Sequence, residues 1–196
     1  MSKSVEFFFD LGSPASYLAW TQLPTLCAQH AAQLVYRPML LGGVFQATGN
    51  ASPAMVPAKA RYVFADFQRY AKRYGVTLAF PPGFPINTLN LMRGTVAVQL
   101  YQPERFEQFL NAVFPAMWAQ QRNLGDPQVL ASVLQEAGFD PEQYQAWTAD
   151  PEVKAALKDA TEEAVRRGAF GAPTIYVGEQ MFFGQDRLEF VAQALS

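Results

Sequence analysis

The sequence predicts an α/β fold that is interrupted by an all-helical segment. Three observations indicate it. Residues 1–44 contain the pattern of a strand, a helix and a second strand, residues 151–196 contain that of a helix, two strands and a closing helix, and residues 45–150 show helical patterns alone. We therefore expect one domain split between residues 1–44 and 151–196, with a helical domain, 45–150, inserted into it.

The N-terminal unit begins with a buried strand over Val5 to Phe9, where the chain is rich in aromatic residues. A helix is expected over about residues 14–30, because Ser13 is a natural N-cap and Pro14 suits a first helical turn. The stretch "AQLVYRPML" follows as a second strand. Two strands joined by a helix should lie parallel, with a right-handed crossover between them.

The middle segment consists of helical patterns separated by turns and loops. Such patterns cover about residues 59–75 and 88–121, and the proline-rich stretch "FPPGFPIN" between them is expected to be a loop. Shorter helices are expected over 127–136 and 141–147. One stripe of the pattern over 88–121 is apolar and should face the core: Phe106, Leu110, Val113, Phe114 and Met117.

The C-terminal segment returns to mixed structure. A helix over 151–167 ends at Gly168, and "GAPTIYVG" and "QMFFG" give two short strands around a tight turn at Gly178. A last helix is expected over 187–195. The order of all these elements is that of a thioredoxin-like fold with the all-helical insertion of DsbA.

Composition and charge narrow the functional classes. The 15 basic and 17 acidic residues leave a net charge of −2, so no nucleic-acid partner is expected. No apolar stretch approaches the roughly 20 residues of a membrane span and the start lacks a signal-peptide pattern, so we expect no membrane partner and a cytoplasmic location. The single cysteine, Cys27, and the single histidine, His30, argue against a disulfide framework, a Ser/His triad and a metal site.

Candidate site residues stand where the first strand meets the first helix. Ser13 and Ser16 occupy the positions at which a redox protein of this fold carries Cys-x-x-Cys, and hydroxyls cannot exchange disulfides. Ser13 has a second interpretation as a plain N-cap, and Ser16 as a packing residue of the first turn. The Ala172-Pro173 bond lies where such folds place a cis-proline beside the active site, and we expect it to be cis.

Four stretches carry a resemblance to a known family: "FFFDLGSPASYLA", "TGNASP", "FGAPTIYVG" and "FFGQDRLEF". They resemble the bacterial 2-hydroxychromene-2-carboxylate isomerases and are similar to the related kappa-class glutathione transferases, which share the DsbA-like fold. The resemblance covers essentially the whole chain. It implies a glutathione-dependent cis-trans isomerase, with glutathione as cofactor, a small aromatic substrate and a homodimeric state.

The resemblance also implies roles for particular residues. The serine that matches Ser13 acts on the glutathione sulfur, and the positions that match Asn50 and Ala172 bind glutathione. The segment that holds its glutamyl end matches Phe183, Gly184, Gln185 and Asp186. A hydroxyl at a helix N-terminus favours a bound thiolate, and the backbone before a cis-proline can pair with an extended peptide. The simpler interpretations are a turn residue for Asn50 and a helix cap for Asp186.

Two positions depart from the family pattern. Where isomerases of naphthalene catabolism carry a lysine and a tyrosine that contact the carboxylated substrate, this chain has Phe45 and Phe84. Two alternatives to the isomerase therefore stay open. One is a kappa-like transferase that conjugates electrophiles, and the other is a cysteine-less thioredoxin-fold binding module. Their responses to glutathione distinguish the three.

Overall fold

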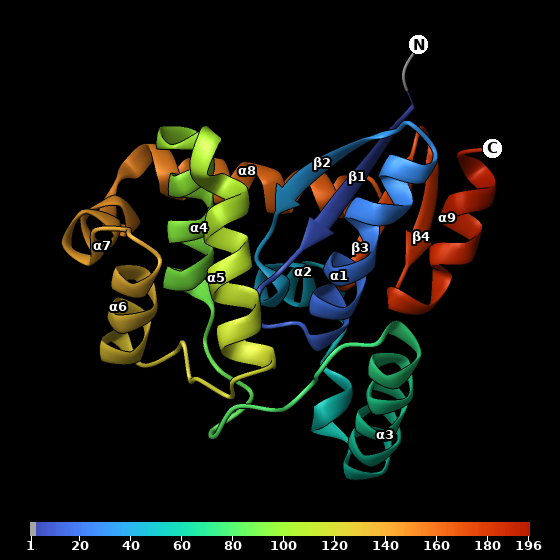
Figure 1. The fold of residues 1–196 in the computed structure, drawn as a ribbon, viewed down its shortest axis with the longest axis horizontal. Coiled ribbons are helices and arrows are strands. Elements are labelled where there is room, and N and C mark those ends of the chain that lie inside the picture. The colour runs from blue at the N-terminus through green and yellow to red at the C-terminus, as the bar shows by residue number, and fades with distance from the viewer. Residues whose placement is uncertain (1–2) are drawn as a thin grey trace.

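The computed structural model describes residues 3–196 and is built on one four-stranded sheet (Figure 1). The strand order is β2-β1-β3-β4, and β1 pairs parallel with β2 and antiparallel with β3, which pairs antiparallel with β4. This arrangement confirms the predicted thioredoxin-like fold. The strands are β1 (Ser4–Phe9), β2 (Gln33–Pro38), β3 (Thr174–Val177) and β4 (Gln180–Phe183).

Helices cover both faces of the sheet because β1 is apolar on both sides. Phe7 and Phe9 stack 5.1 Å apart on the face that packs with α1 and α9, whereas Phe8 lies in the smaller cluster on the other face, with α2 and α8. Glu6 interrupts the apolar run on the Phe8 side, where Arg167 donates two hydrogen bonds to its carboxylate. These helices are α1 (Pro14–Gln29), α2 (Leu41–Thr48), α8 (Pro151–Arg166) and α9 (Leu188–Ala194).

The segment between β2 and α8 is helical throughout its regular structure. Its helices share one continuous core with the sheet, since the ring of Phe114 lies 5.8 Å from that of Phe9. The five apolar stripe residues predicted for this segment are all buried. The helices are α3 (Pro57–Tyr74), α4 (Leu89–Tyr101), α5 (Phe106–Trp118), α6 (Pro127–Glu136) and α7 (Pro141–Ala149), with single 3-10 turns at Pro53–Met55 and Pro103–Arg105.

The structure corrects three details. The continuous helix expected over 88–121 is two helices, because Pro103 lacks the N–H that an uninterrupted helix needs. The helix α2 was not expected, and it crosses the boundary between 44 and 45 of the proposed domain division, which stays a prediction. The closing helix begins one residue late, at Leu188, after a 3-10 turn over Gln185–Arg187.

No helix among residues 3–196 is both long enough and apolar enough to cross a membrane. The same residues bring together no group of three or more histidine, cysteine, aspartate or glutamate side chains that could hold a metal ion.

Candidate active site

Ser13 joins two distant parts of the chain. Its Oγ accepts a hydrogen bond from the backbone N–H of Ser16 (3.1 Å) and donates one to the carbonyl oxygen of Ala172 (3.0 Å). The first bond is the N-cap of α1, as predicted. The second brings Ser13 against the Ala172-Pro173 bond, which is cis, also as predicted. The Ser13 hydroxyl is therefore placed where a helix N-terminus meets the backbone before a cis-proline.

Ser16 has a different environment from Ser13. Its side chain is fully buried, and its Oγ has no hydrogen-bond partner among the described residues. It does not line the cavity beside Ser13. Ser16 is thus a packing residue of the first helical turn, and its backbone N–H, rather than its hydroxyl, serves the site.

A cavity of about 670 Å³ opens beside Ser13, at the end of α1 that lies nearest α2 and α3 (Figure 1). It is bounded by the β1–α1 turn, α2, α3, the proline-rich loop and the segment after β4. Apart from Ser16, the residues that the sequence suggested for the site all line this one cavity: Ser13, Asn50, Ala172, Phe183, Gly184, Gln185 and Asp186. The two phenylalanines that depart from the family pattern, Phe45 and Phe84, line it as well.

Other polar residues that line the cavity are held by contacts within the protein. Asn50 donates its Nδ2 hydrogen to the carbonyl of Phe170 (2.8 Å), so it bridges the turn after α2 and the loop before β3. Asp186 forms an ion pair with Arg187, and α9 has no side-chain cap, so the interpretation of Asp186 as a helix cap is wrong. Gln185 is buried, and its carbonyl accepts a hydrogen bond from the Tyr74 hydroxyl.

Asp10 is a buried carboxylate whose role no sequence motif indicates. Its Oδ1 accepts from the N–H of Gly12 (2.8 Å), and its Oδ2 accepts from the N–H of Leu41 (2.8 Å) and the hydroxyl of Thr88 (3.0 Å). Burial raises its pKa, and the three donors oppose that rise. The side chain thereby fixes the turn before Ser13, the start of α2 and the start of α4 relative to one another. In the sequence, Asp10 is indistinguishable from an ordinary polar residue at the end of a strand.

Two further charged residues, which no sequence motif marks, line the cavity from α3. They are Lys59 and Asp66, which share a face of that helix with the apolar residues Val63 and Phe67. Asp66 pairs with Arg69 (3.1 Å). The spacing of these residues on one face was a usable signal, but only the tertiary structure shows that this face points toward Ser13.

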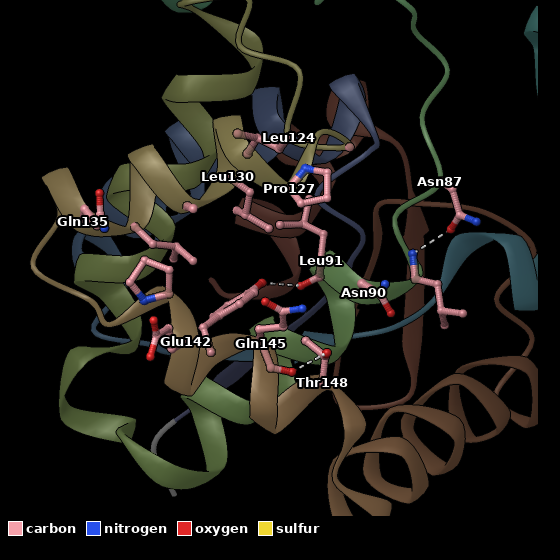
Figure 2. A pocket seen from close by; sticks show the side chains of 16 residues that line it. Asn87, Asn90, Leu91, Leu124, Pro127, Leu130, Gln135, Glu142, Gln145 and Thr148 are labelled. Carbon is pink, nitrogen blue, oxygen red and sulfur yellow. Dashed lines mark hydrogen bonds between the residues drawn. The ribbon is translucent and has the colours of Figure 1, made fainter.

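A second cavity, of about 560 Å³, lies between α4, α6 and α7 (Figure 2). Its described lining residues are amide and apolar side chains with Glu142, Thr148 and Tyr144, and the Tyr144 hydroxyl donates to the carbonyl of Leu91 (3.1 Å). None of the candidate site residues lines this cavity. The chemistry-bearing residues are therefore gathered in the cavity beside Ser13.

Comparison with known proteins shows the family to which the chain belongs. The family model described as "DSBA-like thioredoxin domain" matches residues 4–196, so the chain belongs to that family. Within the family, it is 31% identical to the 2-hydroxychromene-2-carboxylate isomerase of Sphingobium xenophagum, over 100% of this chain and 99% of the relative. It is also 32% identical to human glutathione S-transferase kappa 1, over 100% of this chain and 92% of that protein.

A solved structure of a 2-hydroxychromene-2-carboxylate isomerase matches with a TM-score of 0.86 and 28% identity, over 98% of this chain and 94% of that one. The chain is thus a member of the group that contains these isomerases and the kappa-class transferases, which confirms the resemblance seen in its motifs. It is an enzyme of this group.

Proposed function

We propose that this protein is a glutathione-dependent cis-trans isomerase that acts on 2-hydroxychromene-2-carboxylate or a related aromatic compound. The observation that carries the proposal is the position of Ser13. Its hydroxyl caps a helix of 16 residues, faces the backbone before a cis-proline and borders a cavity of about 670 Å³. A site of that build suits a thiol-bearing peptide whose sulfur lies at the helix end.

The charges of the cavity fit the parts of glutathione. The tripeptide has two carboxylates, one ammonium group and a thiol. Lys59 offers a cation for one carboxylate, and the buried amide of Gln185 can donate to the other. Asp66 and Asp186 offer acceptors for the ammonium group. Asn50 and the backbone of Ala172 also line the cavity and can bind the peptide groups.

Bound glutathione supplies a thiolate that adds to a conjugated double bond of the substrate and leaves again after rotation. The chain's own residues make the thiolate available. The Ser13 hydroxyl, which donates to the carbonyl of Ala172, can turn to donate to a sulfur, and the dipole of α1 adds partial positive charge at the start of that helix. Both effects lower the pKa of a thiol bound there, and its proton passes to solvent.

A kappa-like transferase is the second candidate, and the 32% identity to human glutathione S-transferase kappa 1 favours it. The two activities differ in what happens to glutathione. For the isomerase, sub-stoichiometric glutathione supports many turnovers of 2-hydroxychromene-2-carboxylate, followed by ultraviolet absorbance, and free thiol is undiminished at the end. Stoichiometric loss of thiol, with a conjugate found by mass spectrometry, would identify the transferase instead.

Calorimetric titration with glutathione tests what both enzymes share. A protein that does not bind glutathione would be neither, and a cysteine-less binding module would then be the better description. The homodimeric state and the cytoplasmic location belong to the same proposal, and light scattering on the purified protein tests the first of them.

A further inference from the structure

One wall of the cavity beside Ser13 is largely aromatic, although Lys59 and Asp66 lie on the same face of α3 as its apolar residues from that helix. It is made of side chains from α2, α3 and the proline-rich loop: Leu41, Phe45, Val63, Phe64, Phe67 and Phe84. The ring of Phe84 packs 6.3 Å from that of Phe64 and 5.4 Å from that of Trp118. Trp118 in turn donates its Nε1 hydrogen to the carbonyl of Leu11 (2.8 Å). The wall is therefore anchored to the backbone two residues before Ser13.

The α2 side of this wall has a fixed position as well. The carboxylate of Asp10 binds the N–H of Leu41 and the N–H of Gly12, and this holds the start of α2 beside the turn that carries Ser13. Phe45 follows Leu41 by one helical turn on the same face, and both line the cavity. A molecule that reacts next to Ser13 thus has Phe45 and Phe84 as neighbours.

The cavity has little positive charge for an anionic substrate. Among the described residues that line it, Lys59 is the single cation, against the carboxylates of Asp66 and Asp186. Several basic residues line a different groove, between α2, α4 and α8: Arg93, Lys154, Lys158 and Arg166. In the proposed function, Lys59 is already engaged by glutathione. A substrate carboxylate against the aromatic wall would be desolvated without a partner, which is unfavourable.

From this arrangement we infer that the preferred electrophile is uncharged at its reacting end: an aromatic α,β-unsaturated ketone is bound in preference to the corresponding keto acid. The inference rests on the proposed function and, among the aromatic compounds that it covers, favours the uncharged relatives of 2-hydroxychromene-2-carboxylate. Its basis is the apolar wall beside Ser13 and the single lining cation.

Two unreactive probes of one skeleton test the inference without turnover. Benzylacetone and benzylpyruvate differ only in a methyl group or a carboxylate on the ketone. In ligand-observed NMR titrations of the glutathione-saturated protein, we expect benzylacetone to bind at least about tenfold more tightly. Equal binding, tighter binding of benzylpyruvate or no saturable binding of either would overturn the inference. Glutathione saturation is established first by calorimetry, so its absence would show that the proposed function itself fails.

A variant adds the missing charge. Phe45→Lys should reverse the preference so that benzylpyruvate binds more tightly, and it should likewise raise the rate with benzylidenepyruvate relative to benzylideneacetone. Phe45→Leu is the matched control, because it changes the size of the side chain without adding charge, and it should keep the preference for the ketone. A Phe45→Lys protein that folds, binds glutathione and still prefers the ketone would show that the wall does not contact the substrate.

Discussion

Replacing Ser13 with alanine separates the structural from the chemical role of its hydroxyl. In the structure the hydroxyl makes two hydrogen bonds, one as the N-cap of α1 and one to Ala172. Loss of the cap should cost about 1 kcal/mol and loss of the second bond about another 1 kcal/mol. For a chain of this length, a combined loss of about 2 kcal/mol lowers the melting temperature by roughly 4–8 °C. The protein should therefore stay folded at room temperature.

The chemical effect should be larger than the structural one. A free thiol with a pKa of about 8.5 is roughly 3% ionised at pH 7, whereas a thiol whose pKa is lowered by about two units is roughly three-quarters ionised. The Ser13 hydroxyl and the start of α1 together thus increase the thiolate fraction of bound glutathione by up to about 25-fold. The Ser13→Ala variant should lose most of this increase. The assay is a pH titration of the ultraviolet absorbance of glutathione bound to the protein, in which the apparent thiol pKa should rise.

Ser16→Ala is the control for Ser13→Ala. The Ser16 hydroxyl is buried without a partner, and the backbone N–H that serves the cap remains. Its removal should change stability by less than about 0.5 kcal/mol and leave the pKa of the bound thiol where it was. If Ser13→Ala binds glutathione with an unchanged thiol pKa and near-normal turnover, or if Ser16→Ala behaves like it, the assignment of Ser13 is wrong.

The remaining predictions concern charge, packing and the single thiol. The Arg167 guanidinium lowers the pKa of Glu6 below its ordinary 4.5, so the stability that this ion pair adds is present above that value and lost as pH falls through the lowered pKa. Glu6→Gln should cost at most about 1 kcal/mol in urea unfolding at pH 7, since the pair is partly exposed, and should remove that acid-dependent loss. Gly94→Ala places a Cβ 1.8 Å from the Tyr144 ring, and thermal unfolding should show a loss of about 1–3 kcal/mol or more; an unchanged melting temperature would contradict the packing of α4 on α7. Burial raises the pKa of Cys27 to about 11, so iodoacetamide at pH 8 should modify this thiol only after unfolding, as mass spectrometry can check.

The elements that sequence reasoning identified have strong local causes. The N-terminus of α1 is fixed by a serine cap and a proline in the first turn, and β1 by a run of aromatic residues. The helix α2 has no such signals. It contains Gly42 and Gly43, only Val44 is buried in it, and its N-cap has no side-chain hydrogen bond. Its formation depends on tertiary contacts, above all the bond from Leu41 to Asp10.

The residues of the candidate site also divide into those with local sequence signals and those whose role depends on tertiary contacts. Ser13 and Ala172 could be found because a turn and a proline mark their positions in the chain. Asp10, Lys59 and Asp66 could not, because their importance comes from which segments meet around them. Asp186 does not cap α9 for a related reason. Its carboxylate pairs with the neighbouring Arg187, and Asp186 lies within the 3-10 turn that precedes α9.

The three hydrogen bonds of Asp10 also define boundaries at which one segment of the chain could be exchanged for another. They fasten the polypeptide at Gly12, Leu41 and Thr88, and the stretch between the last two carries α2, α3 and the proline-rich loop, which make the apolar wall. A transplant of residues 42–87 from a relative would enter and leave at fixed anchor points and would leave Ser13, Ala172 and the residues after β4 unchanged in sequence. Asn50, Lys59 and Asp66 lie inside the exchanged stretch and would have to be kept. For engineering new substrate specificities by segment exchange, Leu41 and Thr88 are therefore suitable boundaries of the exchanged segment.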